Sequence, residues 1–185
     1  KVVKAQSASV VRLDYFLKLG LDPKQRATGG NTLLHSASAA GLNDPVLQAL
    51  LAKGLRVNET NQAGQQPLHV ATLKSIDVLV RAGAEVDAPD ASGRTALLLA
   101  ATERRADVIT ELLRLGASVH RADGKGRTPL HEAVLAQCEA CIDQLLAAGA
   151  PRAARDADGL SPVELVNGPP GGARRSYRPR WAEKL

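Results

Sequence analysis

Two cysteines are the residues of this sequence best suited to covalent chemistry. Cys138 and Cys141 lie three positions apart in the stretch CEAC, a spacing at which two thiols can form a disulfide or act as a redox pair. No alternation of strands and helices surrounds the pair, and a thioredoxin-like site would require one. Three interpretations therefore stand: two unreactive thiols, which the context favours, a structural disulfide in an oxidising compartment, or a redox-active pair.

The four histidines point to structure rather than to catalysis. His35, His69 and His131 occupy the same position of a recurring motif, and His120 lies alone, so the spacing is not that of a metal site. Neither a GxSxG nucleophile motif nor a phosphate-binding loop is present. We therefore expect a protein that is not an enzyme and that uses no cofactor and no metal.

An internal repeat must position all of these residues. Five similar segments, GNTLLHSA, GQQPLHVA, GRTALLLA, GRTPLHEA and GLSPVELV, begin at Gly30, Gly64, Gly93, Gly126 and Gly159. Each of the first four is followed by an apolar run that ends in a glycine turn, as in LLAAG. Several positions recur in phase, which is far more specific than one isolated TPLH motif.

This array resembles the ankyrin repeat over about residues 8–166. The resemblance implies an all-α fold, a solenoid of stacked helix-turn-helix units with projecting β-turn fingers. The residues fit it: Thr128 can cap a helix start, and Pro129 suits the first helical turn. Ile142 and Leu145 then fall on one face of a second helix, which Gly149 ends. No single repeat can bury its apolar face alone, so neighbouring repeats must stack.

We predict one domain over residues 1–167, followed by a basic and aromatic tail over 168–185. The domain is divided into an N-terminal half-repeat at 1–27, four repeats at 28–60, 61–90, 91–123 and 124–156, and a truncated repeat at 157–167. From the motif histidine to the glycine that ends the outer helix, His69 to Gly83, the second repeat is four residues shorter than the fourth, His131 to Gly149. Alignment places this loss around Thr72 to Ser75, where we expect either a tolerated shortening or a notch that a partner uses.

The resemblance implies a non-catalytic module that binds another protein through a concave face and the fingers. Residues that vary at the finger tips and on the inner helices are then the candidates for partner binding: Gln65, Ser92, Arg94, Thr102, Glu103, Arg121, Lys125, Arg127 and Leu135. Four of them are basic, which predicts a partner with an acidic patch. We expect the protein to be monomeric when alone.

The tail GGARRSYRPRWAEKL adds Tyr177 and Trp181 to these candidates. Arginines beside stackable rings are a feature of nucleic-acid binding, but the rest of the chain is nearly neutral, although the whole has a formal net charge of +5. We therefore consider nucleic acid an unlikely partner. We expect the two rings either to cover the exposed apolar edge of the last repeat or to contact the partner.

Source and compartment remain expectations. Arginine outnumbers lysine, which favours a bacterial, high-GC coding sequence. Dedicated partners are typical of small bacterial ankyrin proteins, so we expect an inhibitor or immunity-type protein for a toxin or enzyme; the alternatives are a general adaptor or a secreted effector. The sequence begins at Lys1 and contains no methionine. If a signal peptide has been removed from the N-terminus, we expect the protein in the bacterial periplasm. If the N-terminus was only trimmed from the sequence, we expect the protein in the cytoplasm. No apolar run is long enough for a membrane span.

Overall fold

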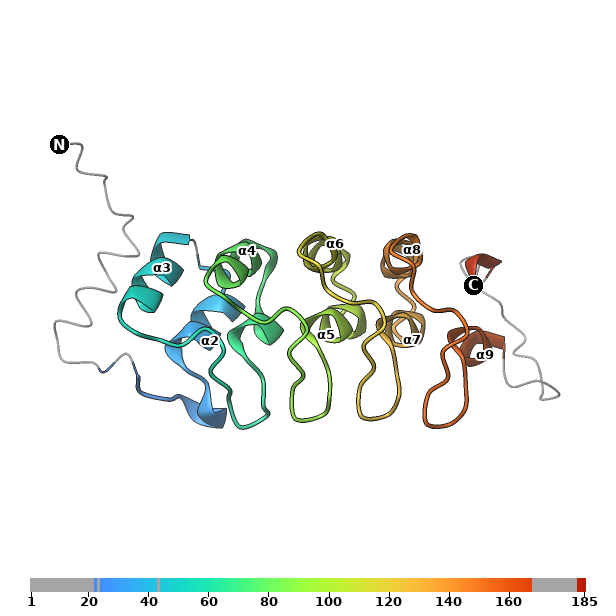
Figure 1. Cartoon of the computed structure of the whole chain (residues 1–185), viewed down its shortest axis with the longest axis horizontal. Coiled ribbons are helices and arrows are strands. Elements are labelled where there is room, and N and C mark those ends of the chain that lie inside the picture. The colour runs from blue at the N-terminus through green and yellow to red at the C-terminus, as the bar shows by residue number, and fades with distance from the viewer. Residues whose placement is uncertain (1–21, 23, 43, 168–182) are drawn as a thin grey trace. The chain divides into compact units, whose positions relative to one another are not determined.

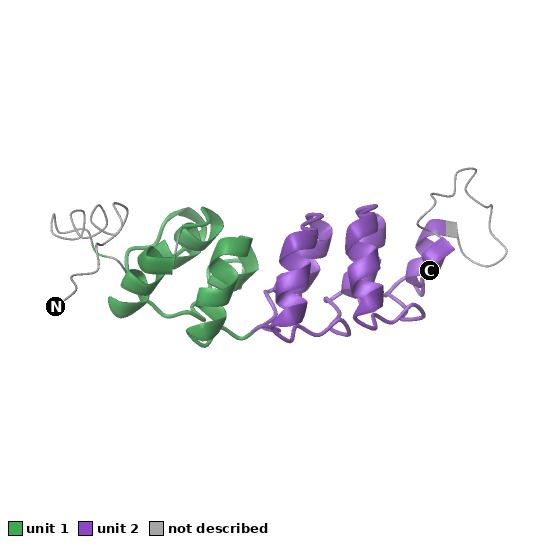
Figure 2. Ribbon diagram, turned by 90° about the horizontal axis from the view of Figure 1, so that it is seen from above, with its two compact units in different colours: residues 1–85 green, residues 86–185 purple. Residues whose placement is uncertain are grey.

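The computed structural model describes residues 22, 24–42, 44–167 and 183–185. Within these ranges the chain forms helices and turns with no β-strand. None of the described helices combines the length and the apolar character that crossing a membrane requires. The chain divides into a first unit, residues 1–85, and a second unit, residues 86–185 (Figure 2). The single domain predicted for residues 1–167 stays a prediction.

The described residues of the first unit form two pairs of short helical elements. The 3-10 turn η1 (Thr28–Gly30) precedes α2 (Leu33–Ala39) and α3 (Asp44–Ala52). The second pair is the 3-10 turn η2 (Pro67–Val70) and α4 (Leu73–Arg81). In this unit α2 packs beside η2, and α3 packs beside α4.

In the second unit, the part of the chain that the structure describes forms two complete helix pairs and one inner helix. These are α5 (Ala96–Thr102) with α6 (Ala106–Arg114), α7 (Pro129–Leu135) with α8 (Glu139–Ala147), and α9 (Pro162–Asn167). Within this unit α5, α7 and α9 form an inner row, and α6 and α8 form an outer row (Figure 1). The loops that precede the inner helices project as fingers (Figure 1). The fold is therefore the ankyrin-repeat, all-α arrangement that the repeat pattern predicts.

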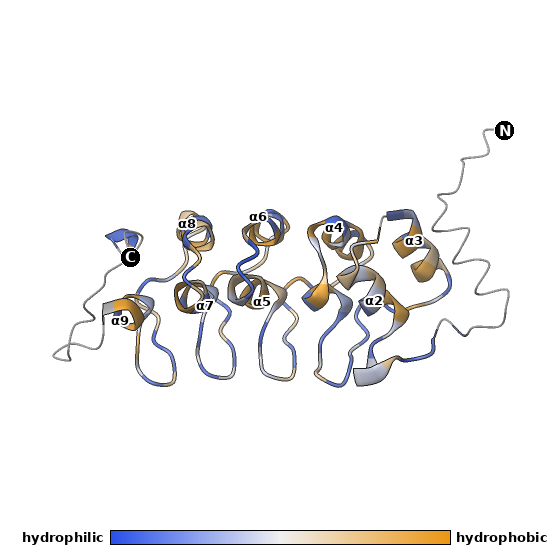
Figure 3. Ribbon diagram, turned by 180° about the vertical axis from the view of Figure 1, so that it is seen from behind, coloured by the Kyte–Doolittle hydropathy of each residue, from blue (hydrophilic) through white to orange (hydrophobic). Residues whose placement is uncertain are grey.

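The core of the second unit is built from aliphatic side chains between the two rows. Leu97, Ile109, Leu130 and Ile142 are completely buried, and each such side chain contributes about 1.5–3 kcal/mol through its removal from water. The helices show hydrophobic orange beside hydrophilic blue, as amphipathic helices should (Figure 3). The periodic apolar positions thus stabilise the stack, and the variable polar positions face solvent.

Threonine and histidine together fix the start of an inner helix. Thr128 Oγ1 lies 2.9 Å from His131 Nδ1, and His131 Nε2 lies 3.1 Å from the carbonyl oxygen of Leu160 in the next finger. A carbonyl oxygen only accepts, so Nε2 donates and Nδ1 accepts. His35 makes the same pair of contacts with Thr32 and Gln65, and its burial lowers its pKa. The predicted structural role is confirmed for these two histidines.

The short second repeat has lost its inner α-helix. Its inner element is the four-residue turn η2, where the other complete repeats have a seven-residue helix. Three of the four missing residues therefore come from the end of the inner helix, and the fourth comes from the junction, since two residues join η2 to α4 and three join α7 to α8. The loss thus lies where inner helix turns into outer helix, slightly before Thr72 to Ser75, where the alignment predicted it. Thr72 N and Ser75 Oγ instead donate to the carbonyl oxygen of Ser38, at 3.2 and 2.9 Å, and so close the junction with α2. Leu42 and Leu73 remain exposed beside it.

Candidate functional site

Each finger of the second unit is pinned by one aspartate. Asp123 Oδ1 accepts hydrogen bonds from the backbone N–H groups of Lys125 and Arg127, both at 2.9 Å. Asp90 and Asp156 pin the neighbouring fingers in the same way. Because both bonds come from main-chain donors, they hold the loop whatever side chain stands at its tip. The fingers can therefore present variable residues on a fixed frame.

Successive fingers are also joined through their backbones. Gly124 N donates to the carbonyl oxygen of Ser92 at 2.9 Å, and Ala157 N donates to that of Lys125 at 2.8 Å. Gly93 has φ 80°, and a Cβ there would lie 2.9 Å from Gly124 N, so only glycine fits this contact. The three fingers of the second unit consequently form one continuous surface.

Arg94 and Arg127, two of the candidate residues, are already paired within the fold. Arg94 Nη2 lies 2.8 Å from Asp90 Oδ2, and the Asp90 carboxylate is almost fully buried. Burial acts to raise the pKa of Asp90, but hydrogen bonds from Arg94 and Ser92 lower it below its ordinary value. Arg127 Nε lies 3.6 Å from Asp156 Oδ2 in the next finger. These two arginines therefore hold fingers in place, besides any contact they make with a partner.

Arg121 and Lys125 are the exposed basic residues of the middle finger. The following finger has two carboxylates, Asp156 and Asp158, and its exposed Arg155 lies 3.0 Å from Glu164 Oε2. Ser92, at the tip of the preceding finger, is exposed and uncharged.

Thr102 and Leu135 end successive inner helices of the second unit. Thr102 Oγ1 donates to Glu132 Oε2 at 3.2 Å, and Glu132 Oε1 lies 3.7 Å from Arg127 Nη1. Leu135 is 45% exposed, an unusual position for a large apolar side chain. The inner-helix ends therefore offer an apolar side chain beside a polar network.

Glu132 is a surface residue that the sequence did not single out. Its position in HEAVL is typical of an ordinary helix-forming glutamate. Its spacing of three from Leu135 places both side chains on the same helix face, and this was the available signal. Glu103, which follows α5, is exposed and pairs with Arg105 at 2.9 Å.

The remaining candidates are not among the described residues of the second unit. Gln65 belongs to the first unit, where its side-chain oxygen accepts from Asn61 Nδ2 at 3.3 Å within the finger. Tyr177 and Trp181 lie outside the described residues, as do the arginines on which the nucleic-acid hypothesis depends. Of the tail, the structure describes Lys184, whose Nζ lies 2.9 Å from Glu139 and 2.8 Å from Asp143 on α8. The end of the chain thus contacts the last outer helix.

Cys138 and Cys141 are joined by a disulfide at the start of α8, with their Cα atoms 5.2 Å apart. Among the described residues there is no group of three or more His, Cys, Asp or Glu side chains that could hold a metal ion.

Comparison with known proteins gives this geometry a family. Residues 72–156 match the family model for ankyrin repeats, in three copies. This part of the chain consists of ankyrin repeats. The chain is also similar to the ANK repeat-containing protein nipk-1 of Caenorhabditis elegans, with 35% identity over 95 residues. That similarity covers 42% of this chain and 16% of the worm protein.

Ankyrin repeats form protein–protein interaction modules, and the family is generally non-catalytic. The fingers and inner-helix ends of the second unit, over residues 90–160, lie almost entirely within the matched region. The candidate surface is thus presented by the ankyrin repeats themselves.

Proposed function

We propose that this protein is a non-catalytic binding module whose protein partner contacts the middle finger and the inner-helix ends of the second unit. One observation carries the proposal: Arg121 and Lys125 are exposed on a finger that Asp123 pins, whereas Arg94 and Arg127 are paired within the fold. A fixed loop loses little conformational freedom on binding, so its charges contribute efficiently to affinity.

The partner has an acidic patch that faces the middle finger and an apolar pocket or ridge that covers Leu135. Thr102 and Glu132 are hydrogen-bonded to each other, so at the inner-helix ends they present a polar pair that is already satisfied within the fold. Asp158 on the next finger repels an acidic surface that extends further, which limits the acidic patch to one finger. This arrangement favours a specific partner over a broadly acidic one.

Within this function we favour a dedicated partner, such as an inhibitor or immunity-type protein for a bacterial toxin or enzyme. The arginine-rich, lysine-poor composition supports a bacterial source. The alternative is a general adaptor or a secreted effector, which would engage several partners through the same fingers. Measurement of the captured partner's own activity separates the two: a dedicated inhibitor suppresses it at equal molar amounts, and an adaptor leaves it unchanged.

The test begins with capture of the partner on the immobilised protein and its purification. Titration calorimetry then compares the native chain with Arg121→Glu/Lys125→Glu. We expect at least about a tenfold loss of affinity, because two attractive charge contacts become repulsive.

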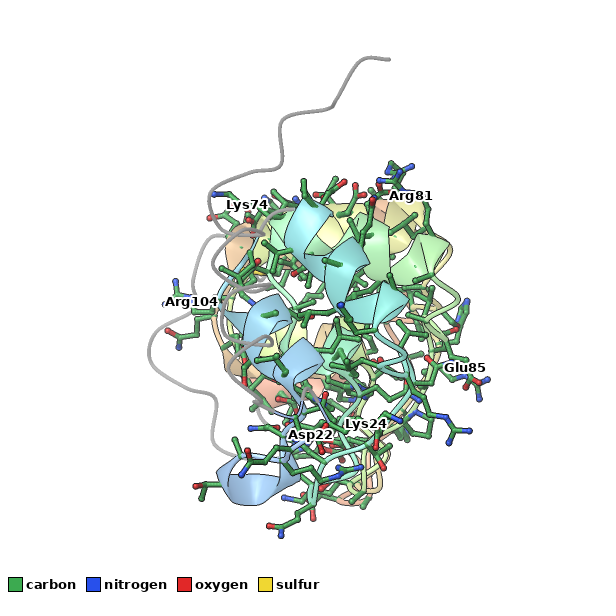
Figure 4. All side chains as sticks on the ribbon, turned by 90° about the vertical axis from the view of Figure 1, so that its left-hand side faces the viewer. Asp22, Lys24, Lys74, Arg81, Glu85 and Arg104 are labelled. Carbon is green, nitrogen blue, oxygen red and sulfur yellow. A yellow bond between two sulfur atoms is a disulfide. The ribbon has the colours of Figure 1, made fainter. Side chains whose placement is uncertain are left out.

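The matched control is Lys53→Glu/Lys74→Glu, which makes the same change of net charge at exposed positions of the first unit. Lys74 points away from the body of that unit (Figure 4). An equal loss of affinity in both variants would indicate only a general charge effect. Native affinity in Arg121→Glu/Lys125→Glu would exclude the middle finger as the binding site.

A further inference from the structure

The disulfide between Cys138 and Cys141 is a feature that protein binding does not use. Cys138 is the N-cap residue of α8, and Cys141 lies in the first turn of that helix. We propose that the pair is a thiol–disulfide exchange site, reducible while the protein stays folded, with Cys138 as the sulfur that external thiols attack.

The ring that this bond closes is small. A disulfide stabilises a fold mainly by restricting the unfolded chain, and the effect increases with the length of the closed loop. This bond spans a sequence separation of three, within one helical turn. It joins no distant segments, so it adds little to the stability that the helix start already has. A structural role therefore explains it poorly.

Helix α6 starts in the same way as α8, without cysteines. Its N-cap Arg105 has φ −91° and ψ 77°, against −94° and 92° for Cys138. Arg105 N donates to the Ala100 carbonyl at 2.9 Å, and Cys138 N donates to the Ala133 carbonyl at 3.0 Å. The repeat thus adopts this backbone with or without the bond. Oxidised and reduced forms can share one fold.

The two cysteines differ in how much of each residue is exposed to solvent. Both residues are buried, but Cys141 is completely so, whereas Cys138 keeps 6% exposure and lies between the exposed residues Gln137 and Glu139. An external thiol can therefore approach the bond from the side of Cys138. In either redox state Cys138 Sγ can accept the backbone N–H of Cys141, 3.3 Å away, so the helix keeps its cap.

A small dithiol can act as the reductant in this exchange. Its thiolate attacks Cys138 Sγ, the bond to Cys141 breaks, and Cys141 leaves as a thiolate that takes up a proton. The second thiolate of the dithiol then attacks the reductant sulfur of the mixed disulfide and releases Cys138, which is also protonated. The dithiol becomes a cyclic disulfide, and two electrons and two protons have passed to the protein.

The first experiment uses the full chain, oxidised with glutathione disulfide, then treated with dithiothreitol in native buffer and alkylated with iodoacetamide. Mass spectrometry counts the alkyl groups, and circular dichroism follows the helices. We expect no alkyl groups before reduction and two after it, with unchanged helicity. Two groups before reduction would show that no bond forms. Reduction only in denaturant, or with loss of helicity, would make the bond a structural one.

The second experiment uses single-cysteine variants to determine which of the two sulfur atoms is accessible to an external reagent. Cys141→Val copies Val108 of α6, and Cys138→Ser keeps a capping atom at the helix start, so both should fold. In native buffer Cys141→Val should react with dithiobis(nitrobenzoate) at least about tenfold faster than Cys138→Ser. The two rates should converge in denaturant. Equal native rates would overturn the assignment of Cys138. The test needs no partner, so its result is independent of the binding function.

Discussion

Arg104 and Gln137 have the same left-handed backbone conformation, φ 61° and 53°, two residues beyond the ends of α5 and α7. Gly41 has the equivalent place after α2, with φ 62°. Arg104 is exposed and projects outward (Figure 4). The turn between inner and outer helix therefore requires a left-handed residue, and two of these three turns lack the glycine that adopts it without strain.

Arg104→Gly and Gln137→Gly should each stabilise the fold. Relief of the left-handed strain exceeds the entropy that an additional glycine costs, and we expect a gain of about 0.5–1 kcal/mol for each. Urea denaturation followed by circular dichroism measures it. Gln48→Gly, at an exposed position inside α3, is the control and should destabilise by about 1 kcal/mol. A loss of stability in both turn variants would contradict the prediction.

Gly41→Ala should have the opposite effect. A Cβ at residue 41 would lie 2.8 Å from Thr72 Oγ1, and the left-handed backbone is unfavourable for alanine as well. We expect a loss of about 1–3 kcal/mol in the free energy of unfolding, measured in urea. Gly54→Ala separates the two causes, since its φ is 86° but no atom lies within 4 Å of the added Cβ. A smaller loss in Gly54→Ala would isolate the contact with Thr72.

The finger aspartates should make the stability of the second unit dependent on acid. The pKa values of Asp90 and Asp156 are lowered in the fold from 3.8. Their contribution is therefore complete above about pH 4 and is lost as the pH falls through the lower folded values. Between about pH 5 and pH 3, the range in which ordinary carboxyl groups titrate, the free energy of unfolding should fall less in Asp90→Asn/Asp156→Asn than in the native protein.

Asn61 provides the precedent for that substitution. Its Oδ1 accepts the backbone N–H groups of Ala63 and Gln65 at 2.9 and 3.0 Å, so a neutral amide can pin a finger. Denaturation curves at several pH values compare the variant with the native chain. Parallel pH profiles for the two proteins would show that other carboxylates cause the acid sensitivity.

Arg94 and Lys125 should differ in what their loss does to the fold. Arg94 is paired with a buried carboxylate, although its own side chain is 38% exposed and the pair is partly screened by solvent. We expect Arg94→Ala to cost about 0.5–1 kcal/mol, and Lys125→Ala to change stability by less than about 0.5 kcal/mol. Thermal denaturation checks both. Equal effects would remove the distinction between the structural and the exposed basic residues.

Leu135 should contribute to binding and little to folding. Leu135→Ala removes a side chain that is 45% exposed, and we expect a cost below about 1 kcal/mol. Leu130→Ala, in the same helix but completely buried, should cost about 2–5 kcal/mol. If the partner covers Leu135, its alanine variant also loses affinity in calorimetry. A stable variant with native affinity would move the apolar contact away from the inner-helix end.

The sequence by itself determined the repeats, their helices and the buried faces. Thr128, His131 and Ile142 recur at fixed positions because capping and apolar periodicity act over a few residues, and such local rules can be read from the letters.

The tertiary structure decided which polar groups are paired. The pairing of Arg127 with Asp156 and of Thr102 with Glu132 joins residues about 30 positions apart, and their distances depend on how successive repeats stack. The replacement of an inner helix by Pro67–Val70 was likewise decided by packing, because the shortened chain had to reach both α2 and α4. Helix capping and apolar periodicity determined the repeat fold of this protein. Contacts between repeats determined which of its charged side chains are paired and which are exposed to a partner.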